Sequence, residues 1–180
     1  MKHLSKLILL GIVLTAVTVM AHNVLREFTG TEILSGPPSG GTVLCPDGEP
    51  TGQFPFGPPC TQGRVQVRNV VFPYVLQASD SRIEGNETVI VNANWDGWTQ
   101  FGPGSGPMWG TVVVQGLAGT WEGAWTGQRE VKASGAHSHI QVIAFGTKGS
   151  VDGMKTNWDI VYTPASPNGK ISGRINERAR

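Results

Sequence analysis

The amino-acid sequence predicts an all-β protein, built as a single antiparallel barrel of about eight strands. Apolar and polar residues alternate with a period of two at 64–68, 88–93 and 121–126, as in strands that bury one face. The chain also has 25 Gly and 12 Pro among 180 residues, and many of them separate short runs rich in Val, Ile and aromatic residues. Closing consecutive strands into a barrel removes their free edges, so we favour a barrel over the alternative, a β-sandwich.

Eight runs have the composition of strands, and each is bounded by Gly, Pro, Asn or Asp. They cover residues 24–34, 64–77, 81–94, 108–115, 120–131, 137–145, 151–163 and 170–176. Pro73 interrupts the second run and predicts a bend or bulge there, or a place at a sheet edge, because proline cannot donate a hydrogen bond to a neighbouring strand. Residues 96–107 are rich in Gly and Pro and predict a long loop.

The first 21 residues have the pattern of an export signal. Lys2 and Lys6 precede a mainly apolar run at 7–21, and Val19 and Ala21 are the small residues that signal peptidase reads. We expect cleavage after Ala21, which leaves residues 22–180 as a single domain that is secreted or periplasmic. The alternative is an uncleaved amino-terminal membrane anchor.

Cys45 and Cys60 bracket a segment rich in Pro and Gly, whose composition excludes a helix or a central strand. In an exported protein such a pair predicts one disulfide, which closes the loop at 45–60. Phe54 and Phe56 lie inside this loop. They could cover a cavity, but we favour the alternative that they attach the loop to the domain.

The charge balance and the motifs exclude several classes of function. With 14 Lys and Arg against 13 Asp and Glu, the chain has no excess of positive charge for binding nucleic acid. After signal cleavage no segment predicts attachment to a membrane. The sequence contains no Gly-x-Ser-x-Gly motif and no phosphate-binding glycine loop, so we expect no nucleophilic hydrolase and no cofactor.

Two tracts in the carboxy-terminal half, at 119–127 and 145–154, carry a strand-turn pattern of regularly placed Gly residues. This pattern resembles that of allene oxide cyclase and the dirigent proteins, a group of small secreted barrels. The resemblance implies an eight-stranded barrel with an apolar cavity, often oligomeric, and carries over no activity. It transfers no catalytic residue to this chain, and the loop at 45–60 departs from the group's pattern.

Aromatic side chains are the candidates for binding a ligand, since indoles often enclose apolar rings. Trp121 and Trp125 alternate with Gly123 and Gly127, a pattern that fits the inside of a tapering barrel. Packing in the core is the alternative function for these residues. The candidate ligand-binding residues are Trp95, Trp98, Trp109, Trp121, Trp125, Trp158 and Tyr162.

Two pairs of polar residues are further candidates. His137 and His139 lie two positions apart, so on a strand they share one face and could bind a metal if a third ligand were near; the alternative is a solvated pair. Glu122 and Asp159 are candidate general acids or bases, but only if the neighbouring tryptophans point outward. We expect the tryptophans to point inward, and hence both carboxylates to face water.

Three classes of function follow from these observations. The first is an exported barrel that binds a small apolar or aromatic molecule. The second is a cyclase or isomerase of the allene oxide cyclase or dirigent type. The third is an extracellular structural or interaction protein, which could form a homo-oligomer through exposed aromatic residues. A cavity lined by carboxylate or Tyr would favour the enzyme, a purely apolar cavity the binding protein, and a filled interior the interaction protein.

Overall fold

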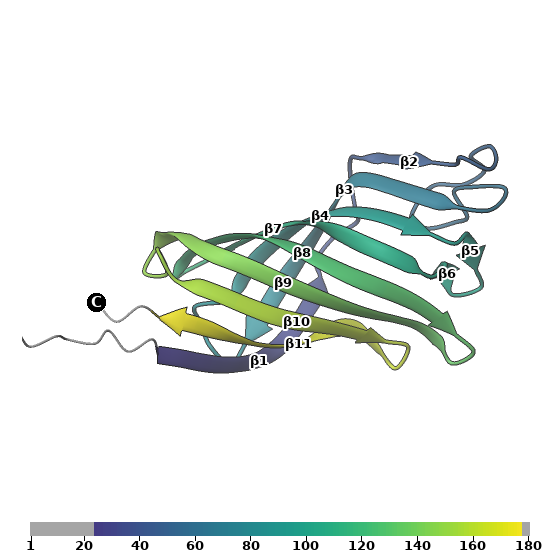
Figure 1. Cartoon of the computed structure of the whole chain (residues 1–180). Helices are drawn as coiled ribbons and strands as arrows, with labels where there is room; N and C mark the ends of the chain where they lie inside the picture. The colour runs from purple at the N-terminus through teal and green to yellow at the C-terminus, as the bar shows by residue number, and fades with distance from the viewer. Residues whose placement is uncertain (1–23, 178–180) are drawn as a thin grey trace, which may run out of the picture.

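The computed structural model describes residues 24–177, and its regular structure consists of antiparallel β-strands (Figure 1). The strands are β1 (Val24–Leu34), β2 (Thr42–Leu44), β3 (Val65–Ala78), β4 (Gly85–Trp95), β5 (Trp98–Thr99), β6 (Gly102–Pro103), β7 (Gly106–Gly116), β8 (Gly119–Lys132), β9 (Gly135–Gly149), β10 (Lys155–Thr163) and β11 (Ser166–Glu177). The described residues include no helix able to cross a lipid bilayer. The predicted signal peptide, residues 1–21, lies outside them.

Nine strands form one sheet in the order β1-β11-β10-β9-β8-β7-β4-β3-β2. Strand β1 also pairs with β3, from Gly30–Ala78 to Leu34–Tyr74, so that eight strands form a ring and β2 lies beside β3, outside it. Both ends of the described chain lie at one end of the ring, and β5 and β6 lie at the other (Figure 1). The prediction of an all-β antiparallel fold is confirmed, and each of the eight predicted strands corresponds to a strand of the ring.

Pro73 lies in regular pairing opposite Thr88 on β4, so the bulge predicted at this residue is wrong. The register of β3 against β4 shifts earlier, between Val67 and Val70, and Asn69 inside this interval has a φ of 56°. The predicted edge position is closer to what is found. On the side of β3 that faces away from β4, the pairing with β2 ends before Pro73 and the pairing with β1 begins after it, at Tyr74. Pro73 therefore lies where β3 has no partner on that side, and its missing N–H leaves no ladder hydrogen bond unmade.

Residues 81–84 form a turn between β3 and β4, although the sequence pattern predicts strand there. The carboxylate of Asp80 accepts a hydrogen bond from the backbone N–H of Arg82 at 3.1 Å, which closes the turn locally. Ile83 is completely buried, and the indole N–H of Trp121 donates to the carbonyl of Arg82 at 2.7 Å. The turn therefore helps to fill one end of the ring.

Two further boundaries differ from the prediction. Residues 151–154, predicted as the start of a strand, form a turn in which Met154 donates its N–H to the carbonyl of Val151 at 3.0 Å. Gly153 has a φ of 77°, which side chains other than glycine rarely adopt. The loop predicted at 96–107 contains the short hairpin of β5 and β6, and the Arg129 guanidinium on β8 donates to the carbonyl of Pro103 at 2.9 Å.

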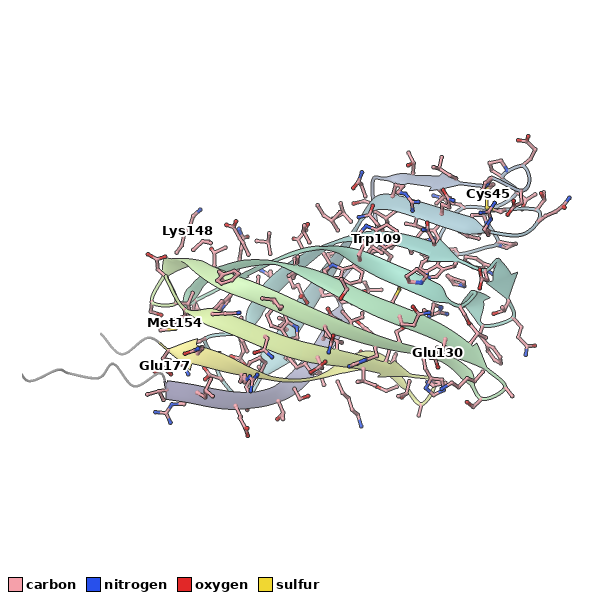
Figure 2. All side chains as sticks on the ribbon, viewed as in Figure 1. Cys45, Trp109, Glu130, Lys148, Met154 and Glu177 are labelled. Carbon is pink, nitrogen blue, oxygen red and sulfur yellow. A yellow bond between two sulfur atoms is a disulfide. The ribbon has the colours of Figure 1, made fainter. Side chains whose placement is uncertain are left out.

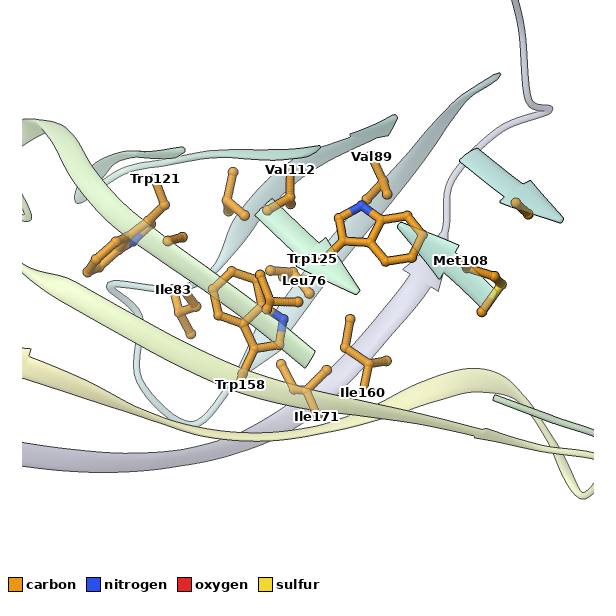
Figure 3. Packing of buried hydrophobic residues seen from close by; sticks show 14 of the residues in the cluster. Leu76, Ile83, Val89, Met108, Val112, Trp121, Trp125, Trp158, Ile160 and Ile171 are labelled. Atoms are coloured by element: carbon orange, nitrogen blue, oxygen red, sulfur yellow. The ribbon is translucent and has the colours of Figure 1, made fainter. Parts of the chain in front are cut away.

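The interior of the ring holds the hydrophobic core. Trp121, Trp125 and Trp158 are all buried, as the inward orientation predicts. In the close-up of this core, Trp121 and Ile83 lie at one end of the labelled cluster and Met108 at the other (Figure 3). The tryptophan side chains are therefore packed among residues from several strands of the ring.

Trp158 provides a test of this packing. Because its side chain is 1% exposed, Trp158→Ala would leave a cavity and lower the free energy of unfolding by about 3–5 kcal/mol. Trp109, with an exposed fraction of 36%, is the matched control, and Trp109→Ala should change that free energy by less than about 1 kcal/mol. Urea unfolding followed by circular dichroism measures both. Equal losses in the two variants would contradict the assignment of Trp158 to the core.

Candidate functional site

The ring contains a cavity of about 290 Å³. Aliphatic side chains from β4, β7, β9 and β10 form much of its wall, and they include Val89, Val112, Val142 and Ile160. Their burial follows from the alternation along each strand, which directs every second side chain to the inside of the ring. Ligand pockets are mostly apolar with a few polar groups and have volumes of about 300–1,000 Å³, and this cavity lies just below the lower end of that range.

Phe54, from the loop at 45–60, covers part of the cavity. Its ring centroid lies 5.8 Å from that of Trp95 and 6.4 Å from those of Phe72 and Trp98. Phe54 also lines the cavity, so it both attaches the loop and covers the interior, whereas Phe56 is 79% exposed. The prediction that the loop is attached to the domain therefore holds for Phe54 and is wrong for Phe56.

The loop is anchored at its base by a covalent bond and an ion pair. Cys45 and Cys60 form the predicted disulfide, a bond typical of proteins from oxidising compartments. Cys45 lies at the end of the molecule that carries β2 (Figure 2). The Arg64 guanidinium donates to both carboxylate oxygens of Asp47 at 2.9 Å, and these hydrogen bonds lower the pKa of Asp47 to about 2.

Two glutamates belong to the polar part of the cavity wall, together with Tyr74, Tyr162, Ser138 and Arg129. Glu32 on β1 is 3% exposed and Glu87 on β4 is 2% exposed. Within residues 24–177, no Lys, Arg or His forms an ion pair with either of them. The hydroxyl of Tyr162 donates a hydrogen bond to Glu32, while neither carboxylate oxygen of Glu87 has a donor. Such an arrangement is unusual, because buried carboxylates are normally paired or hydrogen-bonded.

Burial raises the pKa of Glu87 well above its ordinary value, and the nearby charge of Glu32 raises it further. Because its pKa is raised, Glu87 keeps a proton at a pH where an exposed glutamate is ionised. Burial also raises the pKa of Glu32, and the hydrogen bond from Tyr162 offsets part of this shift. Burial raises the pKa of Tyr74 and of Tyr162, whose hydroxyls therefore remain donors.

Gly169 on β11 makes room for this cluster. A Cβ atom at this position would lie 2.9 Å from Cζ of Tyr162 and 3.2 Å from a carboxylate oxygen of Glu32. It would also lie 2.7 Å from Cγ2 of Ile160. Since these distances are shorter than ordinary van der Waals contacts, a larger residue would displace the hydroxyl that bonds Glu32.

Two indole N–H groups add possible donors. Trp95 and Trp125 line the cavity, both are buried, and the nitrogen of each has no acceptor among the described residues. A buried N–H without an acceptor is unfavourable. The cavity thus combines an apolar wall with two carboxyl groups, the tyrosines Tyr74 and Tyr162, the Ser138 side chain and the Arg129 guanidinium.

The aromatic candidates fall into three groups. The structure places Trp95, Trp125 and Tyr162 in the cavity wall. Trp121 and Trp158 lie in the core, where they do not line the cavity, and Trp98 contacts Phe54 from outside the lining. Trp109 lies on the outer surface of the ring, with the Arg68 guanidinium 5.5 Å above its ring (Figure 2).

The polar candidates all lie on the outer face of the ring, as the inward tryptophans predict. His139 is paired with Asp159 at 3.0 Å, and Glu122 accepts a hydrogen bond from Thr147 at 3.0 Å. His137 contacts a serine hydroxyl at 3.2 Å. Between residues 24 and 177 no third His, Cys, Asp or Glu joins the two histidines in a group that could hold a metal ion.

The carboxyl groups of the cavity, Glu32 and Glu87, are absent from the sequence-based candidates. The alternation of apolar and polar residues along their strands could have identified them. Glu32 is in phase with Phe28, and Glu87 is in phase with Val89, so each is an acidic residue on the apolar face of its strand. An ionisable residue at such a position is a candidate for a perturbed pKa.

Comparisons of this chain with protein-family models, curated proteins and solved structures find no match. The cavity and its side chains are therefore the basis for any functional assignment.

Glu87→Gln tests the ionisation of the cavity. The unfolded chain has an ordinary glutamate pKa near 4.5, whereas the folded protein holds the proton to higher pH. The stability that this group contributes is therefore fully present below pH 4.5 and is lost as the pH rises through the raised folded-state pKa. Glu87→Gln, which carries no charge, should be more stable than the original protein at pH 8.5 by at least about 1 kcal/mol.

The measurement is the melting temperature between pH 5.5 and pH 8.5, where about 1 kcal/mol corresponds to a shift of roughly 2–4 °C. The decrease with rising pH should be smaller in Glu87→Gln than in the original protein. Glu122→Gln, on the outer face, is the control and should leave the profile unchanged. Parallel profiles for Glu87→Gln and the original protein would contradict the raised pKa.

Proposed function

We propose that this chain is an exported β-barrel protein that binds one small apolar or aromatic molecule inside its barrel. The observation that carries the proposal is the cavity of about 290 Å³, lined mainly by aliphatic and aromatic side chains. A barrel of eight strands has an interior just wide enough to hold side chains or one small ligand. A filled interior would favour an interaction protein, whereas the cavity supports a binding protein.

Export is supported by two independent features. The amino-terminal 21 residues have the charge and hydropathy pattern of a cleaved signal peptide. The disulfide between Cys45 and Cys60 fits the oxidising environment into which such a peptide leads. The site of action is therefore outside the cytoplasm.

The binding proposal is tested with two variants at adjacent positions of β9. Ile140 lines the cavity, whereas Gln141 is exposed on the outer face. In isothermal titration calorimetry, the protein should bind neutral aromatic molecules such as 2-phenylethanol, indole or 2-naphthol with Kd values in the millimolar to micromolar range. Ile140→Trp fills the cavity and should abolish binding, while Gln141→Trp should leave Kd unchanged.

Equal binding by Ile140→Trp and the original protein would place the ligand elsewhere. Absence of binding for all three molecules would contradict the proposal. Circular dichroism of both variants establishes that the β-structure is retained.

The carboxyl groups favour a second candidate, a cyclase or isomerase of the allene oxide cyclase or dirigent type. Isomerisation next to a carbonyl needs a base that removes a proton from carbon and an acid that hydrogen-bonds the carbonyl oxygen. Glu32, whose pKa is raised less than that of Glu87, would act as the base, and protonated Glu87 would act as the acid. The base then returns the proton to a different carbon, and no cofactor is required.

This candidate is tested with 2-tetralone, a small aromatic ketone. In D₂O the protein should accelerate exchange of the protons next to the carbonyl, followed by NMR, by about 100-fold or more over buffer. Glu32→Gln should lose the acceleration, and Glu122→Gln should retain it. Exchange at the buffer rate, in a sample where 2-tetralone is bound, would exclude this activity and leave the binding function.

A further inference from the structure

The polar part of the cavity contains two carboxyl groups that form no ion pair with any residue between 24 and 177. Glu32 and Glu87 are each at least nine-tenths buried, and both oxygens of Glu87 lack a donor. The charged and titratable groups around them are the hydroxyls of Tyr74 and Tyr162 and the guanidinium of Arg129. Arg129 donates to the backbone carbonyls of Phe101 and Pro103 and forms no ion pair with either carboxyl.

A bound cation would lower the cost of ionising these two carboxyl groups. Like charges in a low-dielectric site repel, so two buried carboxyls without a counter-ion cannot both ionise at low cost. An ammonium group has three N–H donors and one positive charge. It could donate to both oxygens of Glu87 and to Glu32, and its charge would allow the two carboxyls to ionise.

The walls next to the carboxyls suit the rest of such a molecule. Phe72 and Tyr74 stack with ring centroids 6.2 Å apart and an angle of 18° between their planes. Tyr74 is the cross-strand partner of Glu87, so an aromatic ring lies beside the carboxyl group. Aromatic faces attract cations as well as apolar rings. The volume of 290 Å³ accommodates one aromatic ring with a short chain.

We propose that the ligand is a small aromatic amine, with its ammonium group between Glu32 and Glu87 and its ring against the aromatic wall. This inference rests on the proposed binding function and specifies the chemical class of the ligand. It differs from the isomerase candidate, in which the same carboxyls face a neutral carbonyl compound.

The direction in which affinity changes with pH distinguishes an amine ligand from a neutral carbonyl ligand. Binding of an ammonium group requires ionised carboxyls, so the site must release protons, and the affinity for an amine rises with pH until the amine itself loses its proton. A neutral molecule that accepts a hydrogen bond from protonated Glu87 shows the opposite trend. Its affinity falls as the pH rises through the raised pKa of Glu87.

The experiment compares 2-phenylethylamine with 2-phenylethanol, which differ only in the amino or hydroxyl group, by isothermal titration calorimetry at pH 5.5, 7 and 8.5. We expect the amine to bind about tenfold or more tightly than the alcohol at pH 8.5, with a Kd that decreases as the pH rises. Glu87→Gln and Glu32→Gln should each reduce this preference at least about threefold. Glu122→Gln is the exposed control and should retain the preference.

Equal binding of the two molecules, or tighter binding of the alcohol, would overturn the inference while the binding function stands. A preference for the amine that persists in both Glu→Gln variants would overturn it too, because the cation would then bind elsewhere. Failure of both molecules to bind the original protein would count against the inference. Failure of indole and 2-naphthol as well would remove the binding function on which it rests.

Discussion

Strand β1 is hydrogen-bonded on both sides, to β11 along most of its length and to β3 through its second half. This double pairing joins the first and last strands of the ring, and the interior exists because of it. Once the ring is closed, the alternation of each strand decides which side chains share the interior. It brings Glu32 of β1 into the same cavity as Glu87 of β4 and Tyr162 of β10, which are far apart in the sequence.

Much of the strand pattern could be predicted from the sequence because the physical signal is local. Trp121 and Glu122 occupy successive positions of β8, and one is buried while the other is exposed, as the period of two requires. The ends of strands were less predictable. At 81–84 the local composition is compatible with a strand, but hydrogen bonds between Asp80 and Arg82, together with the burial of Ile83, favour a turn. Such tertiary contacts have no local pattern.

The site could be predicted only in part. Aromatic residues inside a small ring of strands predict a lined cavity, and Trp95, Trp125 and Tyr162 do line it. The carboxyl cluster depends on which strands become neighbours across the ring. The pairing of β1 with β3 cannot be predicted from the sequence of either strand alone. Glu32 and Glu87 also cost stability as long as they are buried without a cation. Buried ionisable groups with perturbed pKa values are concentrated at functional sites.

The covering of the cavity by Phe54 bears on the kinetics of exchange. The disulfide and the pair of Asp47 and Arg64 fix the base of the loop, so the loop cannot swing away as a whole. Phe54 is held over the cavity by its contacts with Trp95, Phe72 and Trp98. Under the proposed binding function, a ligand that passes Phe54 would have a residence time set largely by this side chain. Its affinity would be set by other groups of the cavity, so the two properties could change independently.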